Sequence, residues 1–474
     1  MTGSVPAQPG PVSGRNIRPL AGVLAATAVA LTGTRVSAIA LPWFVLVTTG
    51  SAALTGLVAF CEMTPYVLVK MFTGPLVDRV GPRVVSWAAD SLSAVAAALI
   101  PLLHAFGLLP LWLLLTLVAV IGAVRGPGDL AKEIMVPEAA ERSGVPLERA
   151  TGFSGVTERL ASTVGPAAGG ALVALLGPMA GIVVNAVSFA LGSLLVALVL
   201  PREMGRAVPP GNEPPDGPDR GTTSSPTSAG PASTASTSTA PTSEPAGYWR
   251  RFGEGFTFLR GEPLLLTVIV MVGITNLLDA GFAAVLVPVW AERSGDGPAV
   301  IGLTSSAAGI AAVCGSLIAA ALAHRMPRRP VFFAGFLLAG APRFVVLACD
   351  APLWAVLVVF AVSGFGGGFL NPILGAVSFE RVPRRLLGRV RALGDSLAWA
   401  GIPLGGLLAG LAVTSAGLVP VLLAGGALYF LTTNLAGLRP EWREMDRDRG
   451  HRGGRGRDAE DSRTARSEDA AALR

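Results

Sequence analysis

The chain has 474 residues, of which 51% are hydrophobic and only 14% are charged. Because a soluble domain carries about 25% charged residues, this composition excludes an ordinary soluble protein and indicates a membrane protein with many spans. The formal net charge of +6 would suit a nucleic-acid-binding protein. Arginine-rich cytoplasmic loops explain it better in a membrane protein, so we expect a lipid bilayer and no nucleic acid as partner.

Twelve apolar runs, each about as long as a membrane-crossing helix, follow one another in two groups of six. We expect the spans at residues 20–47, 53–75, 84–106, 109–128, 155–176, 179–200, 263–289, 299–322, 331–349, 353–375, 394–414 and 417–437. The sequence therefore predicts an all-α membrane protein with 12 transmembrane helices in two six-helix halves.

The segments outside these runs are polar, and the long central one is rich in Pro, Ser, Thr and Gly, a composition that favours disorder. Aromatic residues and arginines then alternate at helical spacing, which predicts an amphipathic helix on the membrane surface. The expected divisions are a cytoplasmic N-terminal tail at 1–18, an N-terminal six-helix bundle at 19–203, a disordered cytoplasmic linker at 204–246, an interfacial helix at 247–262, a C-terminal six-helix bundle at 263–438 and a disordered cytoplasmic tail at 439–474.

The basic residues are distributed unevenly between the two sides of the predicted bundle. If the N-terminus is cytoplasmic, the six short loops on the opposite side hold a single basic residue, Arg293. Positively charged loops remain in the cytoplasm, so we expect both termini there, in the plasma (inner) membrane of a bacterium.

The two halves carry matching residues at one constant offset of 246 positions. The matched pairs are Pro42 and Pro288, Gly56 and Gly302, Arg79 and Arg325, Arg83 and Arg329, and Val136-Pro137 and Val382-Pro383. Two halves of the same topology form a parallel repeat, related by a pseudo-twofold axis along the membrane normal. This arrangement predicts a substrate cavity between the halves, near the middle of the bilayer.

A short charged loop, GPLVDRVGPR, joins the second and third spans. Gly74 and Gly81 permit positive φ at a tight reversal, while Asp78 is an acceptor beside Arg79 and Arg83. A solvated turn and a contact between the halves are both compatible with these residues.

The fifth span contains GPAAGG. Gly165, Gly169 and Gly170 allow two helix backbones to approach closely, and Pro166 can bend the helix. By itself this segment predicts close packing and no particular chemistry.

These two segments carry a family resemblance. GPLVDRVGPR resembles the major facilitator superfamily signature G-x-x-x-D-R-x-G-R-[KR], and GPAAGG is similar to the family's antiporter motif G-x-x-x-G-P-x-x-G-G. Pro82 departs from the first pattern and Ala161 from the second. Further likeness, around Arg125 to Pro127, Val136-Pro137 and Gly388-Arg389-Val390, is to the branch containing macrolide-efflux proteins and the enterobactin exporter.

The resemblance implies the major facilitator fold and transport by alternating access. It also implies that Asp78 caps the start of the eleventh span, latching the halves in the outward-open state, and that the antiporter-like motif accompanies proton antiport.

Charged residues inside apolar runs are the strongest site candidates. Placing a charge in the membrane costs free energy unless the charge is paired or reached by water. Arg35 lies midway along the first span, and Asp279 lies midway along the seventh, with Asn276 one turn before it. The repeat makes these helices counterparts, so we expect Arg35 and Asp279 to share a depth and pair. A static pair that merely joins helices is the alternative.

The second span carries a polar stripe formed by Glu62, Tyr66 and Lys70 at four-residue spacing. We choose Glu62 as the first candidate for a protonatable carboxylate and Asp279 as the second, whereas Lys70 is expected to reach the interface. Other charges toward the cytoplasmic side are expected to form networks between helices: Asp90, Asp129, Lys132, Glu158, Arg159 and Asp395.

We expect a monomeric secondary active transporter that exports a hydrophobic or amphipathic small molecule (drug, antibiotic or siderophore-like) in exchange for protons. The chain has no P-loop and only three scattered histidines, so we expect no enzyme activity, catalytic residue, cofactor or metal. An importer or facilitator of a small metabolite is one alternative. A non-transporting membrane receptor or assembly protein is another.

Overall fold

The computed structural model describes residues 17–205, 256–322, 326, 328–370, 373–374, 381–382, 387–439 and 442. Most of the predicted tails, linker and interfacial helix lies outside these ranges, so their boundaries stay predictions. Residues 256–261, at the end of that predicted helix, are helical.

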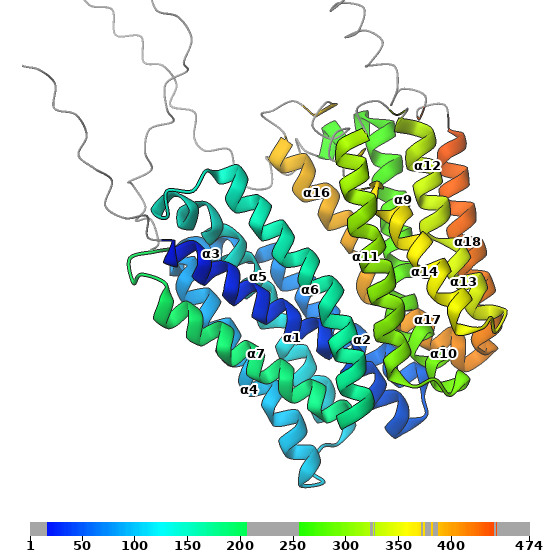
Figure 1. The fold of residues 1–474 in the computed structure, drawn as a ribbon, viewed down its shortest axis with the longest axis horizontal. Helices are drawn as coiled ribbons and strands as arrows, with labels where there is room; N and C mark the ends of the chain where they lie inside the picture. The colour runs from blue at the N-terminus through cyan, green and yellow to red at the C-terminus, as the bar shows by residue number, and fades with distance from the viewer. Residues whose placement is uncertain are drawn as a thin grey trace, which may run out of the picture.

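The N-terminal half consists of long helices that cross the bundle in alternating directions (Figure 1). Its helices are α1 (Arg18–Thr49), α2 (Ala52–Phe72), the short α3 (Gly74–Val80), α4 (Pro82–Ala105), α5 (Leu111–Arg142), α6 (Leu147–Leu176) and α7 (Pro178–Val199).

The C-terminal half has more interruptions. Its helices are α9 (Pro263–Gly281), the π-helical η1 (Phe282–Leu286), α10 (Val287–Ser294), α11 (Pro298–Leu322), α12 (Arg328–Ala339), α13 (Ala341–Ala348), α14 (Leu353–Gly368), α16 (Leu387–Trp399), α17 (Ile402–Ala416) and α18 (Leu418–Leu438).

Within the described ranges, eleven helical segments are long and apolar enough to cross a membrane, and Leu353–Gly368 is a shorter apolar helix at the place of the tenth predicted span. The outer surface is also apolar: Leu175, Leu198 and Leu438 are 82%, 74% and 76% exposed. Side chains of this kind suit contact with lipid rather than water. The predicted twelve-helix membrane fold is confirmed.

The first two helices illustrate how local sequence sets the helix ends. α1 ends at Gly50, whose φ of 65° is easily adopted only without a side chain. Ser51 then caps α2, because its hydroxyl accepts a hydrogen bond from the Leu54 amide at 3.3 Å. The chain therefore reverses within two residues.

Two predicted spans were too short. The fourth was expected to end at residue 128 and the fifth to begin at 155, but α5 continues to Arg142 and α6 begins at Leu147. The added turns are rich in Ala and Glu, which form helices well, and their charged residues lower the hydropathy. Hydropathy marks the membrane boundary, whereas the helices continue beyond it.

Three predicted spans of the second half are interrupted rather than continuous. The seventh contains the π-helical turn η1, and the eleventh breaks between Trp399 and Ile402. The ninth breaks at Gly340 (φ −101°, ψ −94°), just before Pro342, which has no amide hydrogen to donate. The breaks in the seventh and ninth spans lie close in sequence to Asp279 and Arg343, respectively.

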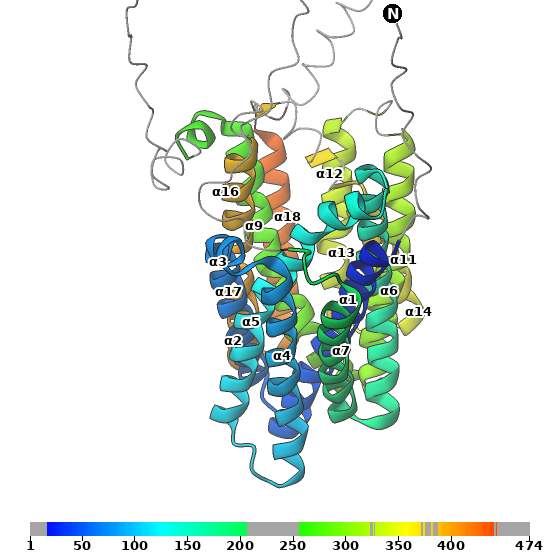
Figure 2. The ribbon, with the colours of Figure 1, turned by 90° about the vertical axis from the view of Figure 1, so that its left-hand side faces the viewer.

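The internal repeat is visible in which helices pack together. In the N-terminal half α1 packs on α6, α2 on α5 and α4 on α7. The corresponding pairs of the second half, α9 with α17, α11 with α14 and α13 with α18, also pack together. Figure 2 shows the N-terminal half in front of the other. The predicted parallel repeat is confirmed.

The two halves meet mainly through α2 against α17 and α6 against α11. These contacts involve small residues toward one end of the bundle, opposite the end where α1 begins and α18 ends. We call it the distal end. A Cβ built on Gly170 would lie 2.9 Å from the Cα of Gly302, and one built on Gly406 would lie 3.0 Å from the Cβ of Ala59. We call these two glycine contacts the distal seam.

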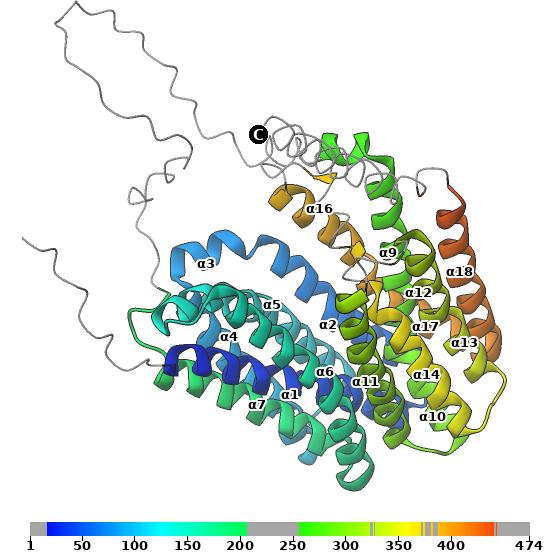
Figure 3. The same cartoon turned by 45° about the horizontal axis from the view of Figure 1, so that its top comes forward.

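At the end of the bundle where α1 begins and α18 ends, the proximal end, the halves separate. Nearly every side chain from Thr151 to Leu160 of α6 is exposed, whereas Gly165, Pro166, Gly169 and Gly170 are buried. Figure 3 shows α3 and α16, both near this end, on opposite sides of the space between the bundles. The structure is therefore closed at the distal end and open at the proximal end.

Candidate functional site

The polar stripe of α2 faces an equally spaced stripe of α5. Three contacts join them: Arg125 Nη1 donates to Glu62 Oε1 at 2.8 Å, Tyr66 Oη to Asp129 Oδ2 at 3.4 Å, and Lys70 Nζ to Glu133 Oε1 at 3.5 Å. The two helices run in the same direction, so each step of one turn on α2 is matched by one turn on α5. The stripe predicted for α2 is thus fully paired.

Arg125 is the centre of this network. Its residue is only 8% exposed, its guanidinium also lies 3.8 Å from Asp129, and it stands 4.4 Å from the centroid of the Tyr66 ring. Arg125 is therefore held by two carboxylates and an aromatic face together. Protonation of Glu62 would remove one of its two charge partners.

Arg35 of α1 lies near this network without joining it. Its side chain is exposed and interacts electrostatically with Arg125, Glu158 and Asp129, but no described ion pair includes it. Its stem packs against α6, since a Cβ added to Gly165 would lie 2.6 Å from the Arg35 Cβ. The glycine therefore makes room for Arg35 beside α6.

The second charged cluster belongs to the C-terminal half. The Arg343 guanidinium of α13 forms a hydrogen-bonded ion pair with Asp279 of α9. Three rings surround the same guanidinium, with centroids 4.8 Å (Phe282), 5.5 Å (Phe344) and 5.7 Å (Tyr429) away. Arg343 is thus fixed by charge and by aromatic faces at once.

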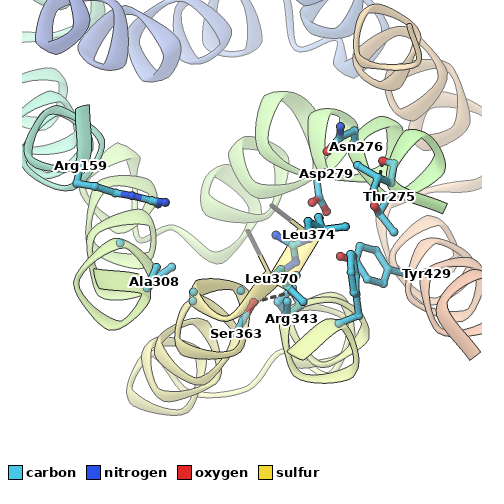
Figure 4. A pocket seen from close by; sticks show the side chains of 18 residues that line it. Arg159, Thr275, Asn276, Asp279, Ala308, Arg343, Ser363, Leu370, Leu374 and Tyr429 are labelled. Carbon is cyan, nitrogen blue, oxygen red and sulfur yellow. Dashed lines mark hydrogen bonds and ion pairs between the residues drawn. The ribbon is translucent and has the colours of Figure 1, made fainter. Parts of the chain in front are cut away.

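A cavity of about 380 Å³ adjoins the Asp279–Arg343 pair. Figure 4 shows that Arg159, from α6 of the other half, reaches toward it from the side opposite Asp279. Val272, Phe336 and Leu370 provide part of its apolar wall. The polar lining residues are Arg159, Thr275, Asn276, Asp279, Arg343, Ser363 and Tyr429.

The predicted pairing of Arg35 with Asp279 is wrong. Asp279 is engaged by Arg343 within its own half, and Arg35 lies near the α2–α5 network of the other half. Asn276 does lie beside Asp279 in the cavity, and its amide donates to the Ala398 carbonyl of α16 at 3.0 Å. The two clusters therefore remain separate, one in each half.

Sequence reasoning missed Arg343 altogether and did not assign Arg125 to the site. Both are arginines inside apolar runs, so the rule that selected Arg35 would have selected them too. Lys70 pairs with Glu133 and lies 5.3 Å from the Trp399 ring centroid, and its expected reach to the interface stays a prediction.

The loop from Gly74 to Arg83 is mostly the helix α3 rather than an open turn. Gly81 adopts the predicted positive φ, 93°, but Gly74 does not and is the first residue of α3. Asp78 and Arg79 are exposed, and Arg83 donates to the Ala197 carbonyl of α7 at 2.8 Å. No described hydrogen bond joins Asp78 to α16 in this proximally open structure, so the latch stays a prediction.

The GPAAGG segment serves two different contacts. Gly165 and Gly169 face α1, where added Cβ atoms would lie 2.6 Å from Arg35 and 3.0 Å from Val36. Pro166 and Gly170 instead face Gly302 of α11 in the other half. The close packing predicted for this motif is present, and half of it forms the distal seam.

Asp90 and Lys132 form a separate buried ion pair inside the N-terminal half. Lys132 Nζ donates to Asp90 Oδ1 at 2.7 Å, and both side chains are 3% exposed. Asp90 Oδ2 has no described hydrogen-bond partner. The pair joins α4 to α5, as expected of a network between helices.

Metal binding has no support in the described ranges, where no group of three or more His, Cys, Asp or Glu side chains is placed to hold an ion.

Comparison with known proteins agrees with this architecture. The Multidrug efflux pump Tap of Mycobacterium tuberculosis (strain ATCC 25618 / H37Rv) is 33% identical over 435 residues, which cover 90% of this chain and 94% of the relative. The Multidrug efflux pump Tap of Mycolicibacterium fortuitum is 31% identical over 431 residues, covering 90% and 97%. A crystal structure of the nucleoside transporter NupG (D323A mutant) shares the fold, with a TM-score of 0.67, 12% identity and coverage of 90% of this chain and 100% of that one.

The sequence also matches the family described as Major Facilitator Superfamily over residues 23–295 and 269–456, which together include both halves. With its twelve-helix repeat, this chain belongs to the major facilitator superfamily and is a membrane transporter rather than an enzyme.

Proposed function

We propose that this transporter exports hydrophobic or amphipathic small molecules in exchange for protons across the bacterial inner membrane. The observation that carries the proposal is the pair of arginine-bound carboxylates, Glu62 with Arg125 and Asp279 with Arg343, placed in opposite halves. The name of the Tap relatives, multidrug efflux pump, supports export of drug-like molecules.

Protonation of either carboxylate links proton binding to a change in the contacts between helices. Protonation neutralises the carboxylate and leaves its arginine with a weaker partner, so the contacts among α2 and α5, or α9 and α13, are redistributed. A group that accepts a proton on one side of the membrane and releases it on the other couples the gradient to transport. Glu62 is our first candidate and Asp279 our second.

The direction of opening fits the export of molecules from inside. Arginine and lysine gather in the loops of the proximal end, which supports a cytoplasmic location for that end and for both termini. The structure then has its opening toward the cytoplasm, the state that loads an exported substrate. Because the cavity forms within one chain, we propose a monomeric transporter.

The test is transport by purified protein in liposomes with an imposed pH gradient. A panel of cationic ethidium, neutral N-phenyl-1-naphthylamine and anionic 8-anilinonaphthalene-1-sulfonate samples amphipathic substrates of each charge. We expect gradient-driven movement of at least one probe, reduced to the level of protein-free liposomes by Glu62→Gln or Asp279→Asn. Glu141→Gln, at an exposed residue of α5, is the matched control.

Probe uptake that needs no gradient and survives both substitutions would contradict the antiport proposal and favour an importer or facilitator. A folded protein that moves none of the probes would favour the non-transporting receptor.

A further inference from the structure

The cavity next to Asp279 has an unbalanced positive charge. Its lining contains two cations, Arg159 and Arg343, but a single carboxylate, Asp279. Asp279 is already bound to Arg343, so the second arginine has no charge partner within the lining.

In the described part of the chain, no carboxylate forms an ion pair with Arg159. Its neighbours one turn away on α6, at positions 155, 156, 162 and 163, are Gly, Val, Ser and Thr, and the facing helix α11 has no charged residue. Glu158 is adjacent to Arg159 in the chain, and no described ion pair joins the two. Arg159 is exposed, and no described ion pair includes it.

The rest of the cavity discriminates between an anion and a cation. A cationic ligand would need Asp279, but displacing Arg343 would leave that guanidinium among Phe282, Phe344 and Tyr429 without a counter-charge. An anionic group needs no such displacement, because Arg159 is available. The apolar wall formed by Val272, Phe336 and Leu370 suits the remainder of an amphipathic molecule.

We infer that the transported molecule carries an anionic group, a carboxylate or sulfonate, which binds Arg159 of the N-terminal half while its apolar part binds the C-terminal half. This assignment rests on the proposed export function and narrows its substrate class to amphipathic anions. Guanidinium groups bind such oxygens through paired hydrogen bonds. One ligand then contacts both halves, on the open side of the distal seam.

The experiment compares two probes that differ by one sulfonate, 8-anilinonaphthalene-1-sulfonate and N-phenyl-1-naphthylamine. Each is titrated by fluorescence into the full-length protein in phosphatidylcholine nanodiscs, with empty nanodiscs subtracted. We expect Arg159→Gln to raise the dissociation constant of the sulfonate probe about tenfold, the effect of losing one charge-assisted contact. The neutral probe should change less than about twofold, a shift too small to reflect a lost contact of that strength.

Two further variants distinguish the loss of the positive charge from a disruption of the fold. Arg159→Lys keeps the charge and should retain most of the sulfonate binding, while Arg149→Gln removes an exposed arginine of the same helix outside the cavity and should change neither probe. Equal weakening of both probes by Arg159→Gln, no weakening, or no protein-dependent sulfonate binding would overturn the inference. Because binding is measured without a gradient, loss of proton coupling with intact Arg159-dependent binding would reject only the proposed antiport.

Discussion

Replacing Lys132 by methionine is expected to lower the free energy of unfolding by about 3–5 kcal/mol, the cost of leaving a buried charge without its partner. Asp90 would keep its carboxylate in a site where both members of the pair are 3% exposed, with Oδ2 already lacking a described partner. Denaturation in detergent micelles, followed by circular dichroism, measures this loss.

The controls for this prediction lie in the same pair and on the same helix. The double variant Asp90→Asn/Lys132→Met removes both charges and should recover at least half of the lost stability. Arg142→Met breaks an ion pair with Glu138 whose side chains are 36% and 34% exposed, so it should cost less than about 1 kcal/mol. Equal losses of stability for Lys132→Met and Arg142→Met would contradict the prediction, because the buried ion pair would then contribute no more than the exposed one.

Enlarging Gly170 should open the distal seam. A Cβ at this position would lie 2.9 Å from Cα and N of Gly302 and 3.0 Å from the Pro298 carbonyl oxygen, all backbone atoms that cannot rotate away. Overpacking of this kind costs about 1–3 kcal/mol, and each 1.4 kcal/mol changes a two-state population tenfold. Gly170→Leu should therefore favour the distally open state and reduce transport to less than about a tenth of the parent rate.

Spin labels at Leu175 of α6 and Trp354 of α14, both exposed, would report this change as a longer distance between the halves. The three native cysteines, Cys61, Cys314 and Cys349, are replaced first. Gly155→Leu is the matched control on α6, because nothing lies within 4 Å of its added Cβ in this state. An unchanged distance in Gly170→Leu, or the same increase in Gly155→Leu, would contradict the assignment of the seam.

The comparison of sequence and structure is most informative at the glycines. The constant offset identified Gly56 and Gly302 as equivalent, and the structure places both at contacts between the halves, Gly56 against Gly406 and Gly302 against Gly170. A repeated sequence predicts that equivalent residues have equivalent surroundings. The repeat does not predict which residues form those surroundings, because the packing of the whole bundle determines which helices meet.

The charged residues show the same limit. Four-residue spacing was sufficient to predict a polar stripe on α2, since spacing along one helix fixes which residues share a face. The partners of Glu62 and Tyr66 lie on α5, and their register depends on how two helices are rotated against each other. Arg343 follows the break at Gly340, and its approach to Asp279 depends on that irregular backbone, which hydropathy does not reveal.

The composition of the distal seam has a consequence for the entropy change of closing it. Burial of glycine, alanine or proline restricts no side-chain rotamers, whereas each leucine or isoleucine would lose about 0.5–1 kcal/mol of conformational entropy on closure. An added Cβ at Gly56, Gly170, Gly302 or Gly406 would lie within 3.0 Å of an atom of the other half. Closing and reopening the seam at these four glycines therefore costs no side-chain entropy at the glycines themselves.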